Sequence, residues 1–296
     1  MAGLDQNMLT LIECLAKNKI QDAKNAAIQC CENDTTKKNK IEIRYYQQLL
    51  KNGNTNFMEL PVMLQSLMRM EDVSNFREDR YYLGKTQKRL FEQICRGRKV
   101  TDKLMEYGIP YRNSSIIYGT PGTGKTEFAR YVAYKLGLPY TYLNFSHLID
   151  SLMGKTAQNL QKVFDFCKGQ QCVLMLDEID CIGINREKGS GSNAEMGRIT
   201  ITLMQCLDDL IDGQIVLAAT NRKDVLDDAL IRRFQNKIEF TIFEQKEELQ
   251  MIKNFVDSID VMEMDEELIE YAKEGHTQSE TIDHLVKKLI QIVSNE

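Results

Sequence analysis

The chain has 296 residues, 43% of them hydrophobic, with 38 basic and 43 acidic side chains and a formal net charge of -5. This length allows two or three domains with real cores, and the acidic excess does not favour attraction of nucleic acid by bulk charge. The aliphatic runs are too short to span a bilayer, and the first residues lack the pattern of a signal peptide. We therefore expect a globular, cytoplasmic protein that is not embedded in a membrane.

The eight cysteines are scattered along the chain. They form no C-x-x-C pair and have no histidine at the spacing of a zinc site. We expect them to be reduced thiols.

Residues 1 to about 75 follow a helical pattern. Leu4, Met8, Leu11 and Leu15 recur at spacings that place them on one face of a helix. Further helices are expected over 40–54 and within the methionine-rich stretch 58–70. These apolar faces either pack against one another or dock a partner, and the sequence leaves both interpretations open.

From about residue 110 the pattern changes to short apolar runs separated by helical stretches. The runs cover 114–118, 140–145, 172–177, 214–220 and 237–242. Near-continuous apolar strands alternating with helices are typical of a parallel sheet buried on both faces. We expect an α/β domain over 79–242, between a helical N-terminal region over 1–78 and a helical C-terminal region over 243–296.

The segment GTPGTGKT, residues 119–126, fits the pattern G-x-x-x-x-G-K-[ST] at every fixed position. It follows an apolar run and precedes a helical stretch, as a phosphate-binding loop must. Backbone N–H groups of such a loop surround phosphate oxygens, helped by the positive end of the following helix. We expect Lys125 to reach the β- and γ-phosphates of a nucleotide and the Thr126 hydroxyl to ligate Mg²⁺.

Polar side chains end two of the apolar runs. Asp177 and Glu178 follow the run 172–177, at the carboxyl end of a strand, where open α/β sheets bind ligands. Asp177 is placed to hold Mg²⁺ through water, and Glu178 to orient and deprotonate an attacking water. Asn221 follows the run 214–220, and its amide is suited to hydrogen-bond both the γ-phosphate and that water.

The order and spacing of these segments resemble those of the AAA+ ATPases, and within them the AAA clade in the narrow sense, from about residue 80 onward. The resemblance rests on Gly119–Thr126 (Walker A), Leu174–Asp180 (Walker B) and Asn221 (sensor 1), and on the stretch ATNRKDVLDDALIRRF at 219–234. It implies a P-loop NTPase fold with a five-stranded parallel sheet in the order 5-1-4-3-2 and a C-terminal α-helical lid. It also implies ATP hydrolysis with ATP and Mg²⁺ as cofactors.

The resemblance assigns a set of nucleotide contacts: Thr120, Pro121, Gly122, Thr123, Gly124, Lys125, Thr126, Glu127 and His276. The stretch EGHTQSETIDHL, which holds His276, is similar to a lid segment whose histidine lies against adenine. The sequence departs from that pattern after His276, where Gln278, Ser279 and Glu280 replace small residues. A histidine here is otherwise a helix-cap residue, and both interpretations stay open.

Arg232 and Arg233 match the arginine fingers of the resembling family. A guanidinium that faces the γ-phosphate stabilises transition-state charge. Both arginines follow a helix that leads away from the strand end carrying Asn221, so we expect them to serve the nucleotide of a neighbouring subunit. Such a head-to-tail contact closes into a ring, and the resemblance implies a homo-oligomer, expected as a hexameric ring.

The pore loop of protein-threading relatives maps onto Ser151–Gly154, where Leu152 replaces the aromatic residue. A second candidate pore loop covers 185–198. An aliphatic side chain grips substrate less firmly than an aromatic ring does, so threading does not follow from the sequence.

Two functions remain open. The first, which we favour by resemblance to small stand-alone bacterial AAA ATPases, is a ring that remodels or unfolds a protein client, or regulates a partner such as a protease, through its N-terminal helices. The second is a nucleic-acid-associated loader or ATP-dependent switch. Only the basic cluster Arg96–Lys99 favours the second function, and such a cluster is more often a solvated helix end.

Overall fold

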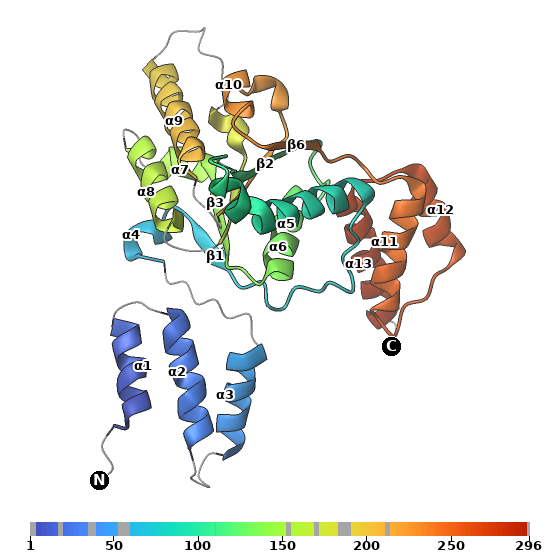
Figure 1. Cartoon of the computed structure of the whole chain (residues 1–296). Coiled ribbons are helices and arrows are strands. Elements are labelled where there is room, and N and C mark those ends of the chain that lie inside the picture. The colour runs from blue at the N-terminus through green and yellow to red at the C-terminus, as the bar shows by residue number, and fades with distance from the viewer. Residues whose placement is uncertain are drawn as a thin grey trace.

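The computed structural model describes residues 4–16, 20–34, 40–52, 60–109, 111–151, 155–168, 172–182, 191–210 and 214–294 (Figure 1). The chain opens with three helices: α1 (Gln6–Ala16), α2 (Ile20–Asn33) and α3 (Lys40–Asn52). Helix α2 contacts both α1 and α3. Among the side chains that the structure describes in these helices, only small ones are buried: Cys14, Ala23 and Ala26. Larger apolar side chains remain on the surface, including Leu4, Met8, Leu9, Ile12 and Leu15, which are 42–59% exposed.

A six-stranded mixed sheet follows, in the order β1-β3-β4-β5-β2-β6. Its strands are β1 (Arg69–Glu71), β2 (Asn113–Tyr118), β3 (Tyr140–Asn144), β4 (Val173–Asp177), β5 (Ile215–Thr220) and β6 (Asn236–Glu239). Strands β2 to β6 are parallel, and counted from β2 they lie in the order 5-1-4-3-2. The prediction of a purely parallel, five-stranded sheet is wrong because β1 adds an antiparallel edge strand to β3.

The missed strand lies inside the stretch 58–70 that the sequence predicts as helical. Helix α4 covers only Val62–Gln65, and β1 begins four residues later. A strand of three residues is too short to show an alternating pattern. Leu64, Leu67 and Met68 are buried in the core beneath the sheet, so the end of the expected N-terminal region packs with the α/β domain.

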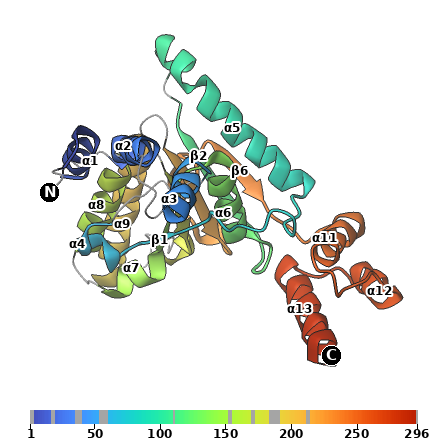
Figure 2. The ribbon, with the colours of Figure 1, turned by 90° about the horizontal axis from the view of Figure 1, so that it is seen from below.

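Helices cover both faces of the sheet (Figures 1 and 2). Side chains of α5 (Lys85–Glu106) and α6 (Lys125–Leu136) fill the core on one face, and those of α7 (Phe145–Ser151), α8 (Thr156–Lys168) and α9 (Gly191–Asp208) fill the other. Successive strand residues alternate between the two cores: Ile116 packs with the second group of helices and Ile117 with the first. This double burial explains the continuous apolar runs in the sequence.

Short helices lie at the carboxyl ends of the central strands: η1 (Ile179–Ile182) after β4, and η2 (Lys223–Val225) with α10 (Asp228–Ile231) after β5. The chain ends in a lid of three helices, α11 (Gln245–Asp257), α12 (Glu266–Glu274) and α13 (Gln278–Ser294), drawn in orange and red in Figure 1. The lid has a hydrophobic core of its own around Ile252 and Leu285.

All eight cysteines are free thiols. Among the described helices, none is both long enough and apolar enough to cross a membrane.

Candidate functional site

The glycine-rich loop 119–124 joins β2 to α6 at the carboxyl edge of the sheet. Two of its glycines hold left-handed backbone angles, with φ of 81° at Gly122 and 77° at Gly124. Glycine adopts these angles without steric cost. A Cβ on Gly124 would meet no atom within 4 Å, so the start of α6 faces open space.

Lys125 is the first residue of α6 and is only 8% exposed. Its Nζ donates hydrogen bonds to the carbonyl oxygens of Gly119 (2.9 Å) and Thr120 (2.8 Å). Burial lowers the pKa of this amine, although the carboxylates of Asp177 and Asp180 oppose the shift. A buried cation at the positive end of a helix indicates an anion site.

Asp177 ends β4 beside Thr126. Its Oδ2 accepts hydrogen bonds from the Thr126 hydroxyl (2.9 Å) and the Tyr142 hydroxyl (3.2 Å). Hydroxyl and carboxylate oxygens are the ligands that Mg²⁺ prefers. The two metal ligands expected from the sequence therefore lie together, and their chemistry fits Mg²⁺.

Glu178 has a positive φ of 56°, which is rare for a residue with a side chain. This conformation turns its carboxylate toward β3, where Oε2 accepts hydrogen bonds from the Ser146 hydroxyl (2.8 Å) and the Asn144 amide (3.1 Å). Strained backbone angles cluster at functional sites. The carboxylate is thus held in one orientation by two polar side chains from the neighbouring strand and helix.

Sequence reasoning missed Tyr142, Asn144 and Ser146. The available signal was the polar end of the run 140–145, since β3 is the parallel neighbour of β4 and Asn144 pairs with Asp177. Side chains at the carboxyl ends of adjacent parallel strands meet at one edge of the sheet.

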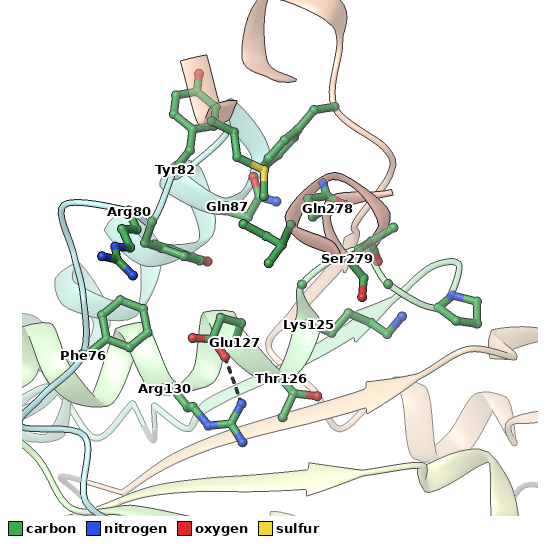
Figure 3. Close-up of a pocket in the computed structure, with 18 of the residues that line it drawn as sticks. Phe76, Arg80, Tyr82, Gln87, Lys125, Thr126, Glu127, Arg130, Gln278 and Ser279 are labelled. Carbon is green, nitrogen blue, oxygen red and sulfur yellow. Dashed lines mark hydrogen bonds and ion pairs between the residues drawn. The ribbon is translucent and has the colours of Figure 1, made fainter. Parts of the chain in front are cut away.

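A cavity of about 650 Å³ lies above the glycine-rich loop, between the sheet, the segment before α5 and the lid (Figure 3). Its polar end is formed by Pro121 to Thr126, Asp177, Glu178 and Asn221. Its opposite end is mostly apolar and comes from three other segments: Phe76 to Gln87, Phe243 to Phe255, and Gln278 to Ile282. The backbone N–H of Ser279 donates to the Gly122 carbonyl (3.0 Å), so the lid touches the loop directly.

Most of the predicted nucleotide contacts lie together. Pro121 to Glu127 and Asn221 line the cavity, whereas Thr120 does not and instead offers its carbonyl to Lys125. His276 is not a lining residue: its ring stacks on Tyr271, with centroids 3.8 Å apart, and its Nδ1 lies 3.4 Å from the buried Glu248 carboxylate. The structure therefore does not bring His276 to the other predicted contacts, because the lid's own packing holds its ring.

The two arginines of the segment DALIRRF lie outside this cavity and differ from each other. Arg233 donates to the Asp208 carboxylate (3.0 Å) and to the Ala229 carbonyl (2.7 Å). The Arg232 side chain is exposed and makes no hydrogen bond or ion pair with a described residue. Arg232 is thus free to contact another molecule, and Arg233 is held within the chain.

The structure does not test the two pore-loop predictions. Leu152 and Gly154 lie outside the described residues, as does the first part of the second candidate loop, up to residue 190.

Residues 115–242 match the family described as "ATPase family associated with various cellular activities (AAA)". An uncharacterised AAA family ATPase, y4kL, of Sinorhizobium fredii is 29% identical over 247 residues, which cover 80% of this chain and 73% of that protein. A probable 26S proteasome regulatory subunit 10B of Caenorhabditis elegans is 33% identical over 55% of this chain and 44% of its own length. The ATP-dependent zinc metalloprotease FtsH 1 of Alkaliphilus metalliredigens is 37% identical over 48% of this chain and 25% of its own.

Proposed function

Since the chain carries an AAA-family ATPase domain, which binds ATP with Mg²⁺ and hydrolyses ATP, we propose that it works as a ring. This ring remodels or unfolds a protein client, or regulates a partner, through its N-terminal helices. Ring assembly is typical of the family. The observation that carries the proposal is the cavity above the glycine-rich loop, with a buried lysine, two metal-ligand oxygens and an oriented glutamate at one end.

In this proposal each group at the polar end has one task. Lys125 and the loop N–H groups bind the phosphates, and Thr126 and Asp177 hold Mg²⁺, which neutralises charge on the phosphate oxygens. Glu178 orients and deprotonates the attacking water. Asn221, which lines the same cavity, hydrogen-bonds the γ-phosphate and that water.

We further propose that Arg232 acts in the site of a neighbouring subunit. The exposed guanidinium of Arg232 lies outside its own cavity. A residue so placed reaches a γ-phosphate only if another subunit presents one. A contact of this kind joins two different surfaces, and repeated contacts of that kind close into a ring.

Subunit mixing tests this arrangement. Arg232→Ala should lower ATP turnover by about 10³- to 10⁵-fold, whereas Arg222→Ala, which removes an exposed arginine paired with Asp224, should leave turnover nearly unchanged. Adding inactive Glu178→Gln subunits to inactive Arg232→Ala subunits should restore activity, because some interfaces then hold a complete site. Mixed rings that assemble, as measured by light scattering, yet remain inactive would contradict action in trans.

The exposed face of α1 supports a protein client or partner. Its residues Met8, Ile12 and Leu15 follow helical spacing and are 42%, 49% and 54% exposed. Apolar side chains gathered on one exposed helix face are typical of docking surfaces. Two of the relatives named above are a protease and a subunit of the proteasome, which agrees with a role in handling proteins.

A comparison of two effectors separates this function from a nucleic-acid switch. An unfolded protein should stimulate ATP turnover, and single-stranded DNA should not. The triple variant Met8→Ser, Ile12→Ser, Leu15→Ser should lose the stimulation while keeping basal turnover. Stimulation by DNA alone would contradict the proposal.

A further inference from the structure

Asn221 lines the polar end of the cavity from the turn that follows β5. Its side chain is exposed and makes no hydrogen bond with a residue that the structure describes. The backbone of the turn therefore sets the position of this amide. That position matters for a group that hydrogen-bonds a reacting water, because a misplacement of about 1 Å lowers a rate by up to about 10²-fold.

The hydroxyl of Thr220, the residue before Asn221, holds the turn. Thr220 ends β5 and is 1% exposed. Its Oγ1 accepts a hydrogen bond from the backbone N–H of Arg222 (2.9 Å) and donates one to Oδ1 of Asp180 (2.7 Å). The first bond closes the turn across Asn221, since it joins the residues on either side. The second ties the turn to the chain that follows β4.

Asp180 lies in η1, which the core holds in place. Ile179 and Ile182 of this short helix are buried in the core that α7, α8 and α9 cover. The hydroxyl of Thr200 on α9 also donates to the Ile182 carbonyl (3.0 Å). Because the chain is anchored on both sides of Asp180, its carboxylate is a fixed acceptor for the Thr220 hydroxyl.

This hydrogen bond connects two neighbouring strand ends. Strands β4 and β5 are parallel, and their backbone pairing ends at Ala218 of β5. Beyond it lie Glu178 and Asn221, the two groups to which the proposed function assigns the attacking water. The contact between Asp180 and Thr220 spans the two strand ends, so it fixes the turn of Asn221 relative to the chain that carries Glu178.

We propose that Thr220 and Asp180 are positioning residues, whose hydrogen bond places the Asn221 amide beside the water that Glu178 activates. Neither residue lines the cavity, so both act through Asn221 and not by touching the nucleotide. This inference rests on the task proposed above for Asn221. Loss of the hydrogen bond should therefore slow the chemical step and leave nucleotide affinity unchanged.

Thr220 is the better position for a test. Burial lowers the pKa of Lys125 and the Asp180 carboxylate opposes that shift, so a change at Asp180 would disturb the phosphate loop as well as the turn. Thr220→Val removes the hydroxyl and should slow single-turnover hydrolysis of ATP about tenfold to a hundredfold. The affinity for ADP at equilibrium should not change. Thr220→Ser, which restores the hydroxyl, should recover most of the rate.

Thr141→Val is the matched control. Thr141 is also fully buried, near the amino end of β3, and its hydroxyl donates to the Val173 carbonyl (3.1 Å), outside the cavity. Thermal unfolding should show a loss of stability in Thr141→Val as in Thr220→Val, because each loses a buried hydrogen bond. Only Thr220→Val should hydrolyse ATP more slowly.

A double-mutant cycle with Asn221→Ala separates positioning from a general structural role. Asn221→Ala alone should slow hydrolysis about a hundredfold. In that background Thr220→Val should cause no further loss, since one residue acts through the other. Losses that multiply in the double variant would show that Thr220 does not act through Asn221, and would overturn the inference.

The failure of this inference differs from the failure of the proposed function. A normal rate in Thr220→Val, with slow hydrolysis in Asn221→Ala, would overturn the inference and leave the task of Asn221 intact. A normal rate in Asn221→Ala would overturn that task and the inference with it. Thr220→Ala, which leaves room for water beside the Asp180 carboxylate, gives the same test if the valine variant does not fold.

Discussion

The two ends of the cavity are built in different ways. One short segment, 119–126, supplies the loop, the buried lysine and the Thr126 hydroxyl, and strand ends add the carboxylates and Asn221. The opposite end draws on the segment before α5, the start of α5 and the lid. A change at the phosphate end should therefore affect every nucleotide and the chemistry itself. A change at the opposite end should affect nucleotide affinity but not the chemical step, because the groups proposed for catalysis lie at the polar end.

Among changes within the cavity, the largest effect is expected for Glu178→Gln. It keeps the shape of the side chain but removes the base, so turnover should fall about 10²- to 10⁴-fold while ATP affinity stays the same. Glu239→Gln is the control, since Glu239 is exposed and also ends a parallel strand, outside the cavity. Steady-state turnover and equilibrium binding measure the two quantities. Near-normal turnover in Glu178→Gln would mean that another group activates the water.

Lys125→Ala should weaken ATP and ADP alike by about a hundredfold or more, since it removes a buried cation from the phosphates. The loss should not depend on the base. Lys135→Ala, on the same helix but in a surface pair with Glu78 (2.6 Å), should bind nucleotide as the wild-type protein does. A Lys125→Ala protein that binds ATP tightly would refute the phosphate-loop assignment.

A comparison of Gly124→Ala with Gly108→Ala distinguishes the loss of space for a phosphate from the cost of an unfavourable backbone angle. Gly124 and Gly108 have similar φ values, 77° and 71°, and a Cβ on either would meet no atom within 4 Å. Each alanine variant should lose about 1–2 kcal/mol of unfolding free energy through the unfavourable backbone angle. Only Gly124→Ala should also weaken nucleotide binding, by at least about tenfold, or ~1.4 kcal/mol. Equal binding by the two variants would mean that phosphate does not approach Gly124.

The smallest effect on nucleotide binding is expected where the α/β core contacts the lid. The Arg80 Nε donates to the Ser258 hydroxyl of the lid (2.9 Å), and its guanidinium lies 5.6 Å from the centre of the Phe255 ring. Loss of this hydrogen bond in Arg80→Leu should weaken nucleotide binding by about 1 kcal/mol, which is roughly fivefold. Arg96→Leu, which removes an exposed ion pair with Glu92 and lies outside the cavity, should change affinity little. The same nucleotide affinity in both variants would show that this contact between core and lid does not support nucleotide binding.

The difference between the two ends also explains which residues of the site can be predicted from the sequence. The phosphate loop and both carboxylates lie in contiguous patterns whose spacing has a local physical cause, so Lys125, Thr126, Asp177 and Glu178 could be located without a structure. The parallel strands beyond β1 follow from the alternation of apolar runs and helices, whereas their order is what the resemblance to the AAA+ ATPases implies. These features depend on neighbours in the chain.

The remaining features depend on contacts between distant segments. Strand β1 is defined only by its pairing with β3, and the segment before α5 and the lid come together around the cavity only after folding. The resemblance maps His276 onto a histidine that lies against adenine, but stacking on Tyr271 and the nearby Glu248 hold it inside the lid. The pattern of neighbouring residues in the sequence does not indicate these contacts.

We infer that the glycine-rich loop and the lid together form one nucleotide site. Hydrogen–deuterium exchange of the Glu178→Gln protein, with and without ATP and Mg²⁺, tests it most directly. Protection should rise at 119–127, at 80–87 and at 276–282, with α1 to α3 unchanged. Protection confined to 119–127 would contradict the claim.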